Sequence, residues 1–251
     1  MNAALFEYLL RQGDNTLVLG HRVSEWCGKA PALEEDIALA NTALDLIGQT
    51  QMWLGYAAEV EGKDRTADTL AYHRDVWDFR SLLLVEQPNG DFGRTIMRQF
   101  LFDAFNVLNL NALMESSDEH IAGIAAKSAK EAAYHLERST ETVIALGDGS
   151  DESHARMQAA LDWLWPYVGE MFKADDVDKT LAADRVIVDP STLRPAWEQT
   201  IRTALSAAIL TVPADDFAHS GGKTGQRHTE HLGHMLAVMQ SLPRAYPDAS
   251  W

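Results

Sequence analysis

The chain has 251 residues, of which 46% are hydrophobic and 23% charged, as in ordinary globular proteins. Its 37 acidic and 21 basic residues give a formal net charge of −16, which repels nucleic acids and anionic lipids and excludes them as working hypotheses. The single cysteine, Cys27, excludes an intramolecular disulfide, and we interpret it as a small packed residue. Because no signal peptide and no run of roughly 20 apolar residues is present, we expect a cytoplasmic protein that contacts no membrane.

The first half of the chain shows apolar residues at helical spacing. The first such run covers residues 6–17. A second extends over residues 33–60 and ends at Gly62, a length of about 40 Å at roughly 1.5 Å per residue. We predict a third helix over residues 66–86, ending at the turn-forming sequence of residues 87–90.

The second half continues the helical pattern, with long helices predicted over residues 92–116 and 120–146. Shorter helices are predicted at residues 151–168, 190–210 and 227–242. Residues 185–189 are the one plausible extended piece. Several helices exceed the usual length, so the sequence predicts an all-α fold built as a long four-helix bundle with extra helices, in a single domain of residues 1–251.

Carboxylates are distributed over the long predicted helices. Bundles of this type bind two iron ions through one Glu on each of two helices and a Glu-x-x-His pair on each of two others. Asp45, Asp75, Asp103 and Glu131 fall one on each of the second to fifth predicted helices. Asp103 interrupts a strongly apolar run, and a buried carboxylate requires a partner.

The histidines of such a site are missing, because no Glu-x-x-His spacing occurs in the sequence. His135 lies four residues after Glu131 and shares its helix face only loosely. We therefore expect no catalytic, cofactor-binding or metal-binding residue in this chain. Instead, we expect the carboxylates to form buried hydrogen-bond networks, with Lys130 or Arg98 as counter-charges. A residual metal site is the alternative. Five residues are interpreted as vestigial di-iron positions: Asp45, Asp75, Asp103, Glu131 and His135.

The C-terminal sequence GGKTGQRHTEHLGH covers residues 221–234. Its Gly-Lys-Thr is similar to the end of a phosphate-binding loop, but the required first glycine is replaced by Phe217 and no strand precedes it, so we reject that function. His228, His231 and His234 recur every three residues. A zinc site is one interpretation; a hydrogen-bonded helix start near an interface is the one we favour.

Four long segments carry a family resemblance, at residues 11–50, 82–92, 130–139 and 221–233. They resemble the C-type subunits of bacterial ring-1,2-phenylacetyl-CoA epoxidases, the multicomponent monooxygenases of aerobic phenylacetate degradation, over nearly the whole chain. The resemblance implies a ferritin-like fold and a tight complex with the catalytic A-type subunit, which carries the di-iron centre and the CoA substrate. It also implies a reductase subunit, with flavin and iron–sulfur groups, that delivers electrons from NADPH.

The resemblance implies that this chain carries no cofactor of its own and is a structural partner that binds and stabilises the catalytic di-iron subunit. The alternative is that the chain is itself an active di-iron carboxylate oxygenase. The missing Glu-x-x-His pairs separate these two hypotheses. A third hypothesis is a ferritin-type storage or homo-oligomeric protein, and a homodimer is also kept as a form of assembly.

Overall fold

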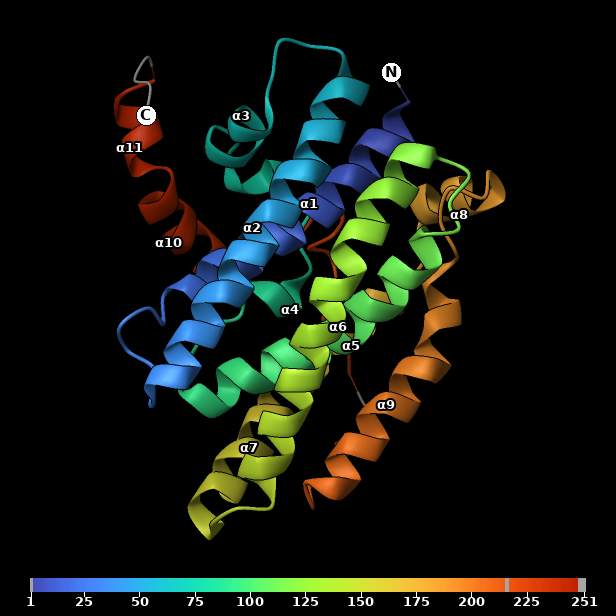
Figure 1. Cartoon of the computed structure of the whole chain (residues 1–251). Coiled ribbons are helices and arrows are strands. Elements are labelled where there is room, and N and C mark those ends of the chain that lie inside the picture. Colours follow the sequence, from blue (N-terminus) through green and yellow to red (C-terminus); the bar gives the residue numbers. More distant parts are fainter. Residues whose placement is uncertain (1, 215–216, 248–251) are drawn as a thin grey trace.

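The computed structural model describes residues 2–214 and 217–247, and within them it contains helices and no strand (Figure 1). Two antiparallel helical hairpins, α1–α2 and α5–α6, form the central bundle, with α2 and α6 side by side. Its long helices are α1 (Ala3–Ser24), α2 (Leu33–Glu61), α5 (Phe92–Leu113) and α6 (Glu119–Gly147). The all-α, ferritin-like bundle with extra helices is thereby confirmed.

Shorter elements connect and cover this bundle. Three join the two hairpins: α3 (Ala67–Tyr72), η1 (Val76–Asp78) and α4 (Leu83–Glu86). Four pack against α5, α6 or α1: α7 (Asp151–Leu164), α8 (Asp176–Ala183), η3 (Pro190–Leu193) and α9 (Arg194–Ala207). A fifth, η2 (Trp165–Phe172), packs against α7, η3 and α4. The last two extend beyond the bundle: α10 (Glu230–Met239) and α11 (Ser241–Ala245).

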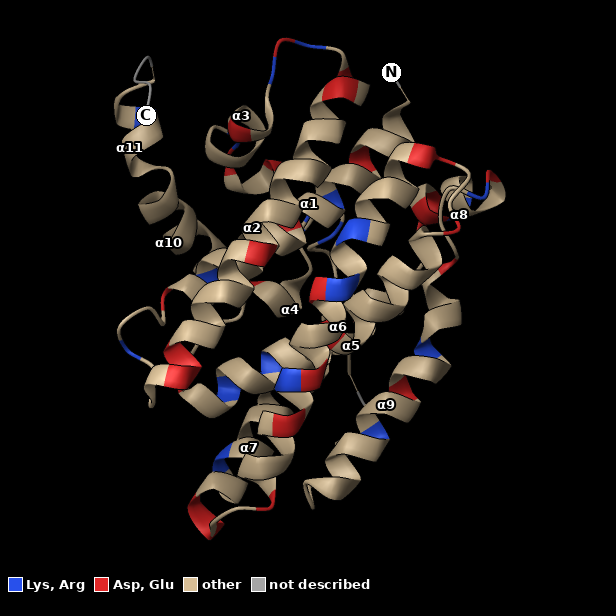
Figure 2. Ribbon diagram, in the orientation of Figure 1, with Lys and Arg blue, Asp and Glu red and all other residues tan. Residues whose placement is uncertain are grey.

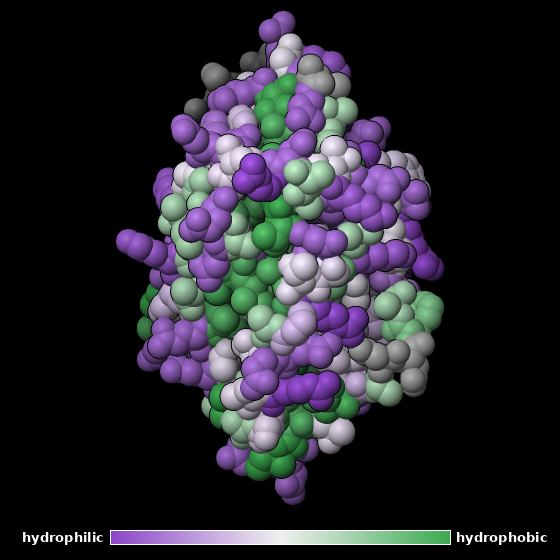
Figure 3. All heavy atoms as spheres, turned by 90° about the vertical axis from the view of Figure 1, so that its right-hand side faces the viewer, coloured by the Kyte–Doolittle hydropathy of each residue, from purple (hydrophilic) through white to green (hydrophobic). Residues whose placement is uncertain are grey.

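Charged residues are distributed unevenly over the outer surfaces of these helices. Figure 2 shows acidic residues near both ends of α2 and few charges between them, whereas α9 carries alternating charges. From the side on which α8 and α9 lie, apolar side chains form a band bordered by hydrophilic ones (Figure 3). The exposed surface therefore contains both solvated faces and faces with little charge.

Local sequence signals account for the ends of the long helices. The side chains of Asn2, Asp91 and Asp118 accept hydrogen bonds from the first free N–H groups of α1, α5 and α6. Gly62 ends α2 with φ at 68°, a left-handed conformation that glycine adopts without steric cost. The bounds predicted for α2, α5 and α6 therefore agree with the structure to within a few residues.

Three predictions of local structure were wrong. Residues 66–86 form three short helices joined by non-helical backbone instead of one helix. Residues 185–189 contain a turn and bends in place of an extended strand, with Arg185 at a φ of 59°. The last predicted helix begins at Glu230, three residues late, and a second helix follows it from Ser241.

Buried polar side chains on α1 explain why residues 66–86 are not one helix. Asp14 is fully buried, and it accepts hydrogen bonds from both terminal nitrogens of the Arg74 guanidinium and, at 2.7 Å, from the backbone N–H of Arg80. The neighbouring Asn15 accepts the N–H of Leu82 at 2.8 Å. In a continuous helix these N–H groups would bond within the helix. Acceptors on α1 replace those bonds and stabilise the irregular path.

Asp14 tests this account, because its removal leaves the buried Arg74 without its carboxylate partner. We expect Asp14→Ala to lower the free energy of unfolding by about 3–5 kcal/mol, the cost of an uncompensated buried charge. The matched control is Asp75→Ala, which breaks an exposed pair with Arg244 and should cost less than about 1 kcal/mol. Urea denaturation of both variants measures the difference. Equal midpoints would show that the Asp14–Arg74 pair does not hold this segment in place.

Candidate functional site: the seam between α2 and α6

Four of the five predicted site residues lie together where α2, α5 and α6 meet. Asp45 of α2 is 3.0 Å, Oδ2 to Nε2, from His135 of α6. One turn along both helices, Gln49 donates a hydrogen bond from Nε2 to Glu131 Oε2 at 3.0 Å. Asp103 of α5 is buried beneath, near enough for the charge of His135 to act on it. The bundle thus brings these residues to one polar region.

Asp75 lies apart from this region, and its predicted place among the bundle carboxylates was wrong. It precedes η1, with its side chain 77% exposed and bonded to Arg244 at 2.8 Å. Its backbone N–H also bonds to Asp78. The physical reason is the absence of the third long helix: without it, no element carries Asp75 into the bundle.

The remaining contacts join α2 to α6 along much of their length. Glu35 forms an ion pair with Arg138, and Tyr56 donates a hydrogen bond to Asp118 at 2.7 Å. The Tyr56 ring stacks on His120 with centroids 3.9 Å apart. We call this row of cross-helix pairs, together with Asp45–His135 and Gln49–Glu131, the α2–α6 seam. Its members bond to one another across the helix pair, which gives them a clear structural role.

Only two hydrogen bonds from neutral groups offset the cost of burying the Asp103 carboxylate. Ser139 donates a hydrogen bond to Oδ2 at 2.9 Å, and Gln99 donates one to Oδ1 at 3.3 Å. Desolvation raises the pKa of Asp103 to about 6, against the opposing effects of His135 and the Ser139 hydrogen bond. The folded chain therefore binds the proton of this carboxyl group more tightly than water-exposed aspartates do, and no basic side chain bonds to it.

The prediction that Lys130 or Arg98 serves as the counter-charge was wrong. Lys130 is exposed on α6. Arg98 is buried, but its guanidinium donates to the backbone carbonyl of Gln87 and, at 2.7 Å, to the side-chain oxygen of Asn89. Arg98 therefore stabilises the turn before α5 instead of neutralising a carboxylate.

The donor set of the seam does not fit the di-iron centre that a ferritin-like bundle suggests. Such a centre requires carboxylates and two histidines directed at one point, whereas the polar region where α2, α5 and α6 meet has one histidine among the predicted residues, His135, whose Nε2 already bonds to Asp45. Amide side chains occupy two interior positions, at Gln49 and Gln99. Within residues 2–214 and 217–247, no three His, Cys, Asp or Glu side chains form a group that could hold a metal ion.

Sequence reasoning missed the neutral polar members of this region. Gln49, Gln99, Ser128 and Ser139 are all buried. The side-chain oxygens of Gln49, Gln99 and Ser128, and Nδ1 of His135, have no hydrogen-bond partner on the described part of the protein. A signal was present, since each lies four or seven residues from a predicted carboxylate or histidine on its own helix, which places it on the same face. A di-iron ligand pattern contains only carboxylates and histidines, so it does not include these residues.

The C-terminal histidines do not form a common site. His228 is buried and places Nδ1 2.7 Å from Oε1 of Glu86 and Nε2 3.2 Å from the backbone carbonyl of Phe79. Glu86 also accepts the N–H of Thr229 at 2.7 Å, one residue before α10. This favours the interpretation of a hydrogen-bonded helix start.

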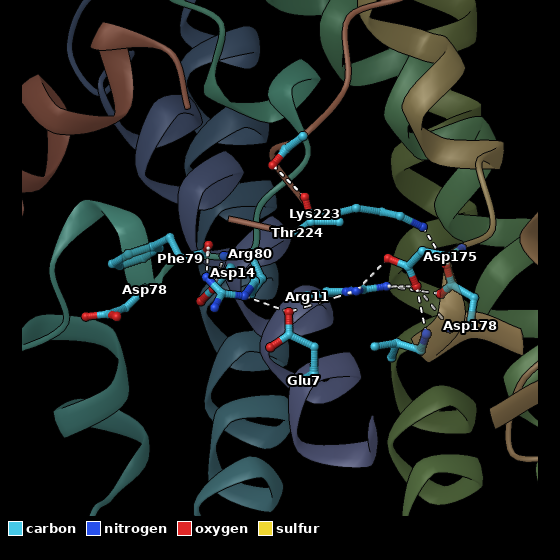
Figure 4. Close-up of polar contacts among 12 residues, drawn as sticks. Glu7, Arg11, Asp14, Asp78, Phe79, Arg80, Asp175, Asp178, Lys223 and Thr224 are labelled. Carbon is cyan, nitrogen blue, oxygen red and sulfur yellow. Dashed lines mark hydrogen bonds and ion pairs between the residues drawn. The ribbon is translucent and has the colours of Figure 1, made fainter. Parts of the chain in front are cut away.

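Lys223 belongs to a buried ion-pair network. Its ammonium group bonds to Asp178, which also pairs with Arg11, and Arg11 pairs with Asp175 (Figure 4). Hydrogen bonds from Arg11, acting against desolvation, lower the pKa of Asp175 to about 2. The network connects α1 to α8 and to the loop before α10. Cys27 is exposed, so its interpretation as a packed residue was wrong.

The fold defines an all-α, ferritin-like bundle protein, and its polar region between α2, α5 and α6 lacks the paired histidines of a di-iron centre. The chain belongs to the family of phenylacetic acid catabolic proteins, whose family model matches residues 1–251. It is 50% identical, over 247 residues, to the C subunit of 1,2-phenylacetyl-CoA epoxidase from Escherichia coli (strain K12), covering 98% of this chain and 99% of that protein. The resemblance found from the four sequence segments is confirmed. Within the described residues, no helix is long and apolar enough to span a membrane.

Burial of Asp103 makes a pH-dependent contribution to stability. Its pKa is about 6 in the folded chain and about 3.9 in an unfolded one, so the folded state binds this proton more tightly. Stability is therefore lost as pH rises from about 4 to about 6, by on the order of 2–3 kcal/mol. Asp103→Asn should remove this loss while keeping the side chain's shape. The measurement is the difference in unfolding free energy between wild type and variant across pH 4–8; a constant difference would contradict the shifted pKa.

Proposed function

We propose that this chain is a structural partner subunit of a cytoplasmic phenylacetyl-CoA 1,2-epoxidase of aerobic phenylacetate catabolism, where it binds and stabilises the catalytic di-iron subunit. The observation that carries the proposal is the 50% identity over nearly full length to a protein named as the C subunit of that enzyme. Subunits of an enzyme work together with partner chains, and identity over 98% of this chain leaves no large segment outside the match.

The chemistry of the seam supports a role outside catalysis. Two hard cations need several carboxylates to neutralise them and histidines at the i, i+3 positions to complete their coordination. Here Asp45 and Glu131 instead bond to His135 and Gln49 across the helix pair. As the family resemblance implies, we propose that partner subunits supply the di-iron centre and an NADPH-oxidising reductase with its flavin and iron–sulfur groups.

The competing function, an active di-iron oxygenase in this chain, is favoured only by the proximity of Asp45, Asp103, Glu131 and His135. That proximity has a structural explanation in the seam itself, because a polar interior between α2, α5 and α6 requires mutually bonded side chains. The two functions predict different effects on the epoxidation rate when the carboxylates are replaced by neutral side chains.

Metal content and activity distinguish the two functions. We expect the chain, purified alone from iron-rich cells, to contain no stoichiometric iron by mass spectrometry, and to raise the solubility and thermal stability of the catalytic subunit when mixed with it. Asp103→Asn and Glu131→Gln, which keep side-chain volume, should leave the epoxidation rate of the reconstituted complex within about twofold, because these residues touch no reacting atom.

Two results would refute the structural role. One is two tightly bound iron ions per copy of this chain. The other is a loss of epoxidation by orders of magnitude in Asp103→Asn or Glu131→Gln while the variant chain still folds and still binds the catalytic subunit. Circular dichroism and co-purification supply these two controls.

A further inference from the structure

The outer face of α2 carries a continuous row of residues at the spacing of a helix-packing seam. Successive members are three or four positions apart, which keeps them on one side of the helix. Leu44 and Ile37 are large apolar side chains with 69% and 53% of their surface exposed. We call this row the α2 stripe; its members are Ile37, Asn41, Leu44, Gly48, Gln51 and Gly55.

The α2 stripe is uncharged although the chain as a whole is strongly acidic. Residues 37–58 contain one charged side chain, Asp45, and that one bonds to His135 within the seam. Figure 2 shows few charged positions along the middle of α2, between its acidic ends. By contrast, α9 carries Arg194, Glu198 and Arg202 at successive turns, and hydrophilic side chains border the apolar band on its side (Figure 3). A face that stays in water is usually charged like α9.

The glycines of the α2 stripe have no packing role within this chain. A Cβ atom added at Gly48 or at Gly55 would meet nothing within 4 Å. On α1 the situation is reversed: a Cβ at Gly13 would overlap Leu54, and one at Gly20 would lie 3.1 Å from Ile47. Those glycines allow α1 and α2 to approach each other. Glycine is otherwise unfavourable inside a helix, so Gly48 and Gly55 fit a neighbour from outside the chain.

We propose that the α2 stripe is the docking surface for a long helix of the catalytic subunit. This proposal rests on the proposed function and names the surface through which it acts. The stripe spans about 27 Å, at 1.5 Å per residue from residue 37 to residue 55. A helix is the element that matches a straight row of this length, and the open glycines let its backbone come close.

Charge determines which chain supplies that helix. The stripe ends in exposed carboxylates, with Glu34 at one end and Glu59 and Glu119 at the other. A second copy of this chain, also at −16, would bring more negative charge to the surface. The structure therefore fits a different chain, whose helix carries small or apolar side chains in its middle and Lys or Arg near both ends. A second copy becomes the competing outcome of the test.

The test compares how tightly the wild-type chain and variants of outward-facing residues bind the purified catalytic subunit. We expect Gly48→Leu and Leu44→Glu to raise the dissociation constant, measured by titration calorimetry, at least tenfold. The matched controls are on α10: Gly233→Leu, where an added Cβ also meets nothing within 4 Å, and Val238→Glu, which is 78% exposed. Both controls should bind within twofold of wild type. All four variants should keep the wild-type circular dichroism spectrum.

A milder pair, Gly48→Ala and Gly55→Ala, separates docking from folding. Because alanine favours a helix, each should raise the melting temperature of the isolated chain by a degree or more and still weaken the complex. Stripe variants that bind as tightly as wild type would overturn the docking proposal and leave the proposed function intact. A wild-type chain that does not bind the catalytic subunit would overturn both. Loss of self-association in the stripe variants, with unchanged binding of the catalytic subunit, would assign the stripe to a homodimer.

Discussion

The structure depends on one constraint: a carboxylate buried in a helical core must receive several hydrogen bonds or a cation. Asp14, Glu86 and Glu170 are almost completely buried, and each receives two or more donors from segments distant in sequence. Glu170, for example, accepts the N–H groups of Leu83 at 2.9 Å and Gly221 at 2.8 Å. These bonds hold the irregular connections against the bundle and determine where the chain leaves helical geometry.

The same constraint distinguishes the two polar regions of the interior. In the network around Arg11, cations balance the acids, and the pKa of Asp175 falls to about 2 despite desolvation. Beside the seam, desolvation raises the pKa of Asp103 to about 6, and the groups that bond to this carboxylate, on Ser139 and Gln99, are neutral. The first region is a structural network of ion pairs. The second contains hydroxyl and amide groups beside its carboxylates.

The two helices of the first hairpin have different surroundings. α1 is buried along most of its length, and its glycines permit close contact with α2. α2 contacts α1 and α6 on its inner sides and leaves its outer stripe exposed. The seam fixes the position of α2 relative to α6, and so it holds the stripe on a rigid support. If the stripe docks a partner helix as proposed, this rigid support lowers the conformational entropy lost on binding.

The sequence by itself determined the family, the long helices and three of the carboxylates that meet in the bundle. Helical periodicity, capping residues such as Asp91 and Asp118, and the glycine that ends α2 are local signals, and local signals suffice for such elements. Only the tertiary structure decided the path of residues 66–86 and, with it, the position of Asp75. That segment has a helical pattern of apolar residues, but its donors bond to Asp14 and Asn15 on α1. Helical periodicity shows only which side of a segment is apolar. It contains no information about the hydrogen-bond acceptors Asp14 and Asn15, which lie far earlier in the sequence and which determined the path of residues 66–86.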